Sequence, residues 1–226
     1  MTLSEESKLI SGASLEVTGV GKVYQPTIGE ILGDIEKYEA SVSLILFNAK
    51  EYLEEQGYNA EGLTTFQFLL INDELRLKFI DALNYFLKSE IKLSRTKDSL
   101  ITTNGVINND NYVDLQQAIF KVACINNQTE TAKPANKKAA EILEKINKAK
   151  KKIKKQVDKN LLLPNMVGAY AARTRIPFNY INEYTLYQFY DQFYRNCMFE
   201  SYDTARHRWI IWGKDTFDTQ TWYKKE

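Results

Sequence analysis

The chain has 226 residues, of which 44% are hydrophobic, and this is enough to bury a core and to exclude a disordered protein. No apolar run approaches the roughly 18 residues that span a bilayer, and the acidic start MTLSEESKLI lacks a signal-peptide h-region. We therefore expect a cytoplasmic protein without a membrane partner. Two cysteines, Cys124 and Cys197, are too few for a disulfide framework, and we expect both to be inert buried thiols.

The formal charge of +1 conceals a division of charge along the chain. Residues 1–136 carry 12 Lys and Arg against 19 Asp and Glu, and residues 137–159 carry 10 Lys against 3 acids. Residues 160–226 are nearly balanced, with 8 basic against 7 acidic side chains. The acidic front and the basic middle can attract each other within one molecule or between copies, which allows a homo-oligomer.

The front half of the chain begins with an extended segment and then turns helical. Residues 13–24 alternate small, β-branched and polar side chains around two glycines, which favours a short N-terminal extended arm. Thr27 and Glu30 have capping-box spacing and predict a helix start. A second helix is expected over residues 40–55.

The apolar stretch over residues 63–87 is predicted core. From Asp73 onward, its apolar side chains share one helical face: Leu75, Phe79, Leu83 and Phe86. Asn104-Gly105 lies between β-branched residues and predicts a type I′ hairpin near residues 99–108. A further helix of about three turns follows, marked by Leu115 and Ile119, with Asp110 as its expected cap.

The back half divides into a linker, a charged helix and an aromatic-rich region. Residues 127–136 contain no large apolar side chain and indicate a linker. Residues 137–159 predict a lysine-rich helix with a narrow apolar stripe at spacings of three and four. Three residues of this stripe are candidate contacts to a partner or to another copy: Ile142, Ile146 and Ile153.

Residues 160–226 hold 16 of the chain's 28 Phe, Tyr and Trp residues. Pro164 predicts the start of a helix that ends before Pro177, and Asn182 is the expected cap of the next helix. A last short helix is expected to hold Trp209 and Trp212 before Gly213. The predicted fold is therefore mainly α, with an acidic helical domain at 1–126 and an aromatic-rich helical domain at 160–226.

Aromatic side chains surround most of the predicted helix that follows Asn182. Leu186, Phe189 and Phe193 form the expected core face by their spacing, while Tyr184 and Tyr194 fall on another. Tyrosine and tryptophan are favoured at protein interfaces because they combine apolar area with a polar tip. The candidate partner-binding residues are Tyr24, Tyr187, Tyr194, Trp209, Trp212, Trp222 and Tyr223.

Residues with catalytic chemistry are scarce. The chain has one histidine, His207, and it stands between Arg206 and Arg208, which disfavours a basic imidazole. No Cys/His cluster has zinc spacing, and the segments 19–22 and 108–111 lack the residues that complete a phosphate-binding loop or a calcium loop. We expect no enzyme activity, no cofactor and no metal.

Nucleic-acid binding is an alternative, because ten lysines beside aromatic side chains could contact phosphates and stack on bases. The run of residues 137–159 contains no arginine for bidentate base contacts, shows no known binding motif and adjoins an acidic front half. A solvated helix face is the favoured interpretation of these lysines.

Two stretches, GKVYQPTIGEIL (Gly21 to Leu32) and the segment from Ile181 to Lys225, lie on either side of the lysine-rich AAEILEKINKAKKKIKK. In this arrangement they resemble tail assembly chaperone-like proteins of large bacteriophages. The resemblance implies a non-catalytic protein of the host cytoplasm that coats the tape-measure protein and helps to deliver tail-tube subunits. The alternative from the same setting is a structural tail or baseplate component that stays in the virion.

Overall fold

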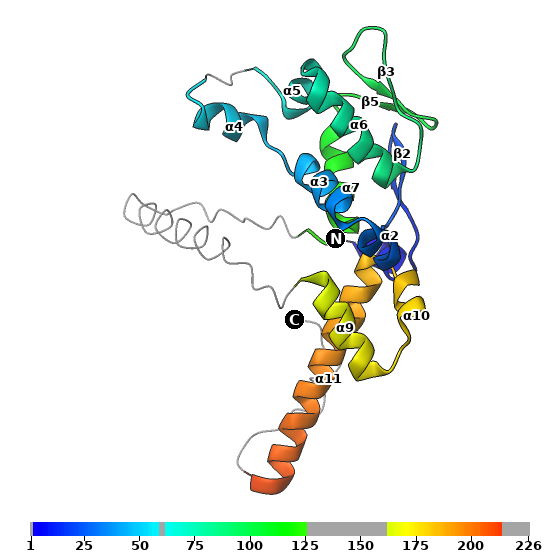
Figure 1. Cartoon of the computed structure of the whole chain (residues 1–226), viewed down its shortest axis with the longest axis vertical. Helices are drawn as coiled ribbons and strands as arrows, with labels where there is room; N and C mark the ends of the chain where they lie inside the picture. The colour runs from blue at the N-terminus through cyan, green and yellow to red at the C-terminus, as the bar shows by residue number, and fades with distance from the viewer. Residues whose placement is uncertain (1, 59–61, 126–161, 214–226) are drawn as a thin grey trace. The chain divides into compact units, whose positions relative to one another are not determined.

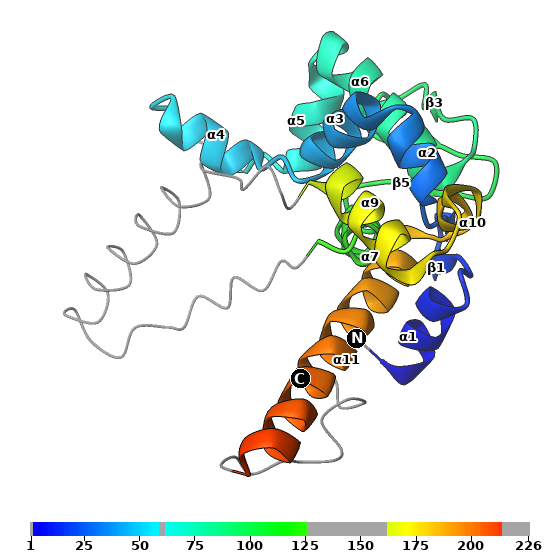
Figure 2. The same cartoon turned by 60° about the horizontal axis from the view of Figure 1, so that its bottom comes forward.

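The computed structural model describes residues 2–58, 62–125 and 162–213 (Figures 1 and 2). The chain divides into two compact units, of which one joins residues 1–125 to 182–226 and the other comprises residues 126–181. The segment 182–226, which the sequence groups with 160–181, is thus in the same unit as the front half. The expected linker at 127–136 and the lysine-rich helix at 137–159 lie outside the described residues.

The protein is mainly α, as expected, and about 64% of the described residues are helical. The helices are α1 (Leu3–Ile10), α2 (Ile28–Gly33), α3 (Ile35–Ile45), α4 (Ala49–Glu55), α5 (Thr65–Ile71), α6 (Asp73–Leu87), α7 (Tyr112–Val122), α9 (Leu163–Thr174), α10 (Phe178–Glu183) and α11 (Leu186–Trp212). The strands are β1 (Leu15–Val17), β2 (Gly21–Val23), β3 (Lys92–Leu93), β4 (Leu100–Ile101) and β5 (Val106–Ile107). They form one two-stranded and one three-stranded antiparallel sheet.

The expected N-terminal arm is itself a hairpin. β1 and β2 pair antiparallel with Leu15 opposite Val23, and the Val20 N–H donates to the Val17 carbonyl at 3.1 Å to close the turn. Gly19 has φ of +76°, which glycine adopts at little cost. Residues 13–24 therefore fold back on themselves as two paired strands instead of extending away from the body.

The hairpin predicted near residues 99–108 is present as β4 and β5, but its turn is not type I′. Neither Asn104 nor Gly105 has the positive φ that this turn requires. Thr102 closes a longer loop instead: its N–H donates to the Gly105 carbonyl at 2.9 Å, and its hydroxyl accepts the Asn104 N–H at 3.2 Å. The loop is thus closed by hydrogen bonds of Thr102 and not by the two positive φ angles of a type I′ turn.

The two hairpins pack turn against turn. The Val106 N–H donates to the Gly19 carbonyl at 2.9 Å, and the Thr102 hydroxyl donates to the Val20 carbonyl at 3.2 Å. A Cβ on Gly105 would collide with the Gly19 carbonyl oxygen and lie 2.7 Å from its carbon. Gly105 is therefore required for the close approach of the two turns rather than for an unusual φ.

The first helix, α1, carries a capping box that our reading of the sequence missed. The Thr2 hydroxyl accepts the Glu5 N–H at 3.2 Å, and the Glu5 carboxylate accepts the Thr2 N–H at 3.0 Å. At the other end, the buried Gln25 amide donates to the carbonyls of Lys8, Leu9 and Ala13. Gln25 fixes the last turn of α1 beside the β1–β2 hairpin.

Helix α2 begins at Thr27 as predicted, and its capping box with Glu30 is present. The single helix expected over 40–55 is wrong, because the Asn48 side chain accepts the Lys50 N–H and starts a new helix, α4. Asp110 is likewise not the cap of α7. Asn111 holds that position, and the Asn108 carboxamide accepts the Asn111 N–H at 3.1 Å.

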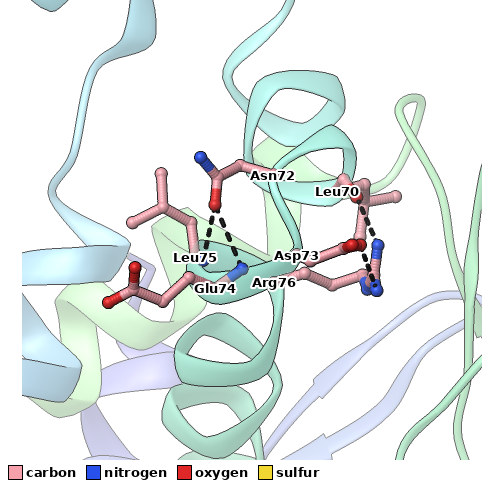
Figure 3. A network of polar contacts seen from close by, with 6 residues as sticks. All are labelled: Leu70, Asn72, Asp73, Glu74, Leu75 and Arg76. Atoms are coloured by element: carbon pink, nitrogen blue, oxygen red, sulfur yellow. Dashed lines mark hydrogen bonds and ion pairs between the residues drawn. The ribbon is translucent and has the colours of Figure 1, made fainter.

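Helix α6 is the centre of the core, as the predicted apolar face indicated. Figure 3 shows its start: the Asn72 carboxamide oxygen accepts the N–H groups of Glu74 and Leu75, and Arg76 reaches back to the Leu70 carbonyl at 3.1 Å. Residues of α6 that are fully or almost fully buried pack with α5, α7 and the β1–β2 hairpin: Phe79, Ala82, Leu83, Phe86 and Leu87. The core of this unit is thus a helical layer against a small hairpin.

We predict that Gly105→Ala lowers the free energy of unfolding by at least about 2 kcal/mol, because the added methyl group collides with backbone that cannot rotate away. Gly33→Ala is the matched control, since nothing lies within 4 Å of a Cβ at that position. Urea denaturation of both variants measures the difference. Equal stabilities of the two variants would contradict the packing of the turns.

Candidate partner-binding surface

Helix α11 is one continuous helix of 27 residues, about 40 Å long. Thr185 caps its start through a capping box with Gln188, and Gly213 ends it in a left-handed conformation with its N–H on the Trp209 carbonyl. Two expectations are therefore wrong: Asn182 lies inside α10 instead of capping the next helix, and no separate short helix holds Trp209. The reason is that no proline or glycine interrupts residues 186–212.

The start of α11 is paired with the start of α2. Thr27 and Thr185 form an antiparallel β-bridge, the Ile28 N–H donates to the Tyr184 carbonyl at 2.8 Å, and the Leu186 N–H donates to the Pro26 carbonyl at 2.9 Å. These bonds use N–H groups that a helix start leaves without intrahelical partners. The two helix starts thereby fix each other in position.

Helix α1 lies against the first turns of α11 (Figure 2). The Gln188 amide donates to the Ile10 carbonyl at 2.9 Å, and the Tyr187 hydroxyl donates to the Glu6 carboxylate at 3.5 Å. Glu5 extends the attachment to α7 by an ion pair with Lys121 at 2.8 Å. The first helix of the chain thus joins α11 to the core.

Asp191 is the last buried residue of α11. Its carboxylate accepts a hydrogen bond from Arg195 Nε at 2.7 Å, and this bond raises the pKa of Arg195, with a smaller contribution from Glu6. A buried carboxylate is unfavourable unless it is paired, so the Arg195 bond stabilises this turn. We call residues 186–191 the root of α11.

Beyond the root, α11 has no buried residue up to Trp212. Large apolar side chains are nevertheless abundant there, with exposed fractions of 59% for Tyr194, 50% for Phe199, 48% for Trp209, 63% for Ile210, 68% for Ile211 and 62% for Trp212. A cluster of large apolar side chains that stays exposed on a folded protein is typical of an interaction site. The distal part of α11 is therefore the candidate surface.

One face of the distal helix carries most of its aromatic area. Residues separated by three and four positions share this face, and we call them the α11 stripe: Tyr194, Met198, Tyr202, Ala205, Trp209 and Trp212. Met198 and Tyr202 are partly exposed, and the Tyr190 and Tyr194 rings stack with centroids 6.1 Å apart. The stripe thus continues from an ordered aromatic contact near the root.

The candidate partner-binding residues do not lie on one common surface. Tyr194, Trp209 and Trp212 lie together on the α11 stripe, whereas Tyr187 is half-buried in the root and packs against the core. Tyr24 follows β2, is 37% exposed and has the Lys88 ammonium 5.8 Å from its ring centroid. Five candidates lie outside the described residues: Trp222, Tyr223, Ile142, Ile146 and Ile153.

The sequence reasoning missed Phe199, Ile210 and Ile211 as exposed side chains. The run WIIW from Trp209 to Trp212 is the signal that could have found them, because four consecutive bulky residues surround a helix and cannot all face one core. The expectation of two buried cysteines is wrong for Cys197, which is exposed on α11. For Cys124, burial raises the thiol pKa to about 12, which leaves it protonated and unreactive.

A groove of about 780 Å³ lies between α3 and α6, lined in part by Lys37, Ser41, Asp81 and Tyr85. Burial, with a smaller effect of Glu30, raises the pKa of Tyr85 to about 12, so its phenol stays neutral. The groove residues include no histidine or cysteine. Within the described ranges, no group of His, Cys, Asp and Glu side chains is arranged to hold a metal ion, and none of the helices there could span a bilayer.

Residues 150–226 match the family model described as the YomV second domain, a phage-derived family. This region contains α9, α10 and α11, so the α11 stripe lies inside the matched part of the chain. No curated protein and no solved structure matches the chain. The C-terminal third is therefore similar to a phage-associated domain.

We predict that Glu5→Gln weakens the acid sensitivity of folding. The hydrogen bond from Lys121, with help from the Thr2 N–H, lowers the pKa of Glu5 from 4.5 to about 2. A lowered pKa contributes stability above pH 4.5, and this contribution is lost as the pH falls toward 2. Both side chains are about a third exposed, so the loss is no more than about 1 kcal/mol.

Urea midpoints between pH 7 and pH 2 measure this effect. The variant should be less stable than the wild type at pH 7 and lose less stability on acidification. Lys121→Gln removes the other partner of the Glu5–Lys121 ion pair. It should likewise make the urea midpoint depend less on pH. Parallel profiles of wild type and Glu5→Gln would show that the pair does not fasten α1.

We predict that Asp191→Ala destabilises the protein by about 1–3 kcal/mol, because it removes a buried ion-pair partner from the root. Asp203→Ala is the control on the same helix, since its pair with Arg206 at 3.1 Å is more exposed and should contribute less than about 1 kcal/mol. Thermal unfolding followed by circular dichroism compares the two. A larger loss in Asp203→Ala would refute the division into root and distal part.

Proposed function

We propose that the protein is a non-catalytic phage tail assembly chaperone that acts in the host cytoplasm by binding the tape-measure protein, the tail-tube subunits or both. The observation that supports this proposal is the α11 stripe, an aromatic face about 27 Å long between Tyr194 and Trp212 that the protein's own core does not bury. A chaperone for long hydrophobic helices needs such a face. No cofactor is required for this activity.

The geometry of the stripe suits a helical partner. Its side chains repeat every three or four residues, and a helix laid alongside presents apolar residues at the same period. The tryptophan and tyrosine side chains add large contact area with few rotatable bonds. The root holds this face in a fixed orientation, because Thr185 and Asp191 are both buried and bonded.

The similarity of residues 150–226 to a phage-derived domain also supports the proposal, since it covers the whole stripe. Two of the arginines that flank the stripe, Arg195 and Arg206, are paired with aspartates of the same helix. The contact face is therefore largely apolar, and its affinity should depend little on salt. This expectation separates the proposal from nucleic-acid binding, which weakens steeply with salt.

Coexpression with the tape-measure protein of the same phage tests the proposal. The wild type should keep the tape-measure protein soluble and elute with it on size exclusion. The triple variant Tyr194→Ala, Trp209→Ala, Trp212→Ala should weaken the complex at least about tenfold, because it removes the large side chains of the stripe. An insoluble tape-measure protein beside soluble wild-type chain would refute the chaperone function.

The double variant Ile71→Ala, Leu77→Ala is the control, because these side chains are 72% and 63% exposed but lie on α5 and α6. It should retain full chaperone activity. Mass spectrometry of purified virions addresses the structural alternative: a chaperone is absent, and a tail component is present in stoichiometric amount.

A further inference from the structure

The α11 stripe is nearly symmetric about its own midpoint. Its outermost members, Tyr194 and Trp212, are centred on position 203, and the next pair, Met198 and Trp209, is centred half a residue later. The inner pair, Tyr202 and Ala205, shares that second centre. A helix face with this property fits a second copy of itself that runs in the opposite direction.

Two such helices placed antiparallel would bring each member of a pair against its counterpart on the other copy. Tyr194 would lie against the second Trp212 at both ends of the contact. In the middle, the bulky Tyr202 would meet the small Ala205, which lets two helix axes approach. We propose that the distal part of α11 forms an antiparallel homodimer through the α11 stripe.

The available area is sufficient for a weak dimer. Tyr194, Trp209, Trp212 and the flanking Phe199 are each about half exposed. An aromatic side chain presents about 150–250 Å², so the four offer on the order of 400 Å² per copy, and Met198 and Tyr202 add to this. The total for two copies approaches the roughly 1,000 Å² that marks the lower limit of a specific interface.

The charges beside the stripe do not oppose this pairing. Arg195 binds Asp191 at 2.7 Å and Arg206 binds Asp203 at 3.1 Å, so each copy neutralises both cations within its own helix. The antiparallel register would also place Arg195 level with the second copy's Ile211 rather than with another arginine. Arg208, which also borders the stripe, would lie level with the second copy's Met198, so these arginines do not meet like charges across the contact.

The dimer is independent of the proposed chaperone function, since it follows from α11 alone. If both are correct, the dimer covers the stripe until a helical partner displaces the second copy. If the protein has another function, the dimer is still expected. Measurements on the purified full-length chain, without a partner, therefore test it separately.

Sedimentation velocity of the wild type, Tyr194→Lys, Trp212→Glu and the double variant provides the test. The wild type should shift from monomer to dimer below about 100 µM. Each single variant should weaken the dimer about tenfold, because it removes an aromatic ring from each end of the contact and places there a charged group that association must desolvate. Only the antiparallel register sets the introduced lysine of one copy against the introduced glutamate of the other, so the double variant should dimerise more tightly than either single variant.

Ile211→Gln is the matched control, because Ile211 is 68% exposed but lies on the opposite side of the helix, and this uncharged change should leave dimerisation unchanged. Both exchanged positions are more than half exposed, so the variants should fold, which far-ultraviolet circular dichroism verifies. A wild type that stays monomeric up to about 100 µM overturns the inference. A double variant that is not tighter than both single variants overturns the antiparallel register.

Discussion

The pairing between residues 26–28 and 184–186 is the constraint on which the arrangement of this unit depends. It joins segments almost 160 positions apart in the chain through the Thr27–Thr185 bridge and two backbone hydrogen bonds. Helix starts have unsatisfied N–H groups, and here α2 and α11 satisfy them from each other's preceding carbonyls. Gly29 allows this approach, because a Cβ there would lie 3.1 Å from the Asn182 carbonyl.

The fixed start of α11 explains how one helix can serve two roles. Its root contributes Leu186 and Phe189 to the interior and is fastened by α1, while its distal part carries large aromatic side chains that are about half exposed. The direction of the root is set by the backbone bonds at Thr27 and Thr185 and by the paired Asp191.

This division sets the α11 stripe apart from the concave part of the fold. The α3–α6 groove is concave but lacks histidine and cysteine, whereas the α11 stripe concentrates aromatic area on one helix face. The stripe also falls in the region similar to a phage-derived domain. The proposed chaperone function and the proposed dimer both depend on this exposed aromatic face.

The sequence by itself determined the elements whose signals are local. The capping box of Thr27, the apolar face of α6 and the Pro164 start of α9 were all predictable, because each depends on side chains within one or two turns. Local signals also misled: Asn104-Gly105 indicated a type I′ turn, but contacts with Gly19 and Val20 impose another geometry. Asn48 divided an expected helix by a cap that competes with the helical pattern.

Only the tertiary structure decided which aromatic residues of α11 are buried. Tyr187 and Tyr194 have the same spacing pattern and similar chemistry, yet one packs in the root and the other is exposed. The difference arises from where the body ends along the helix, and that depends on the long-range pairing of Thr27 with Thr185 and on α1. Sequence spacing specifies the face of a helix, but only the contacts of its ends specify how much of that face is covered.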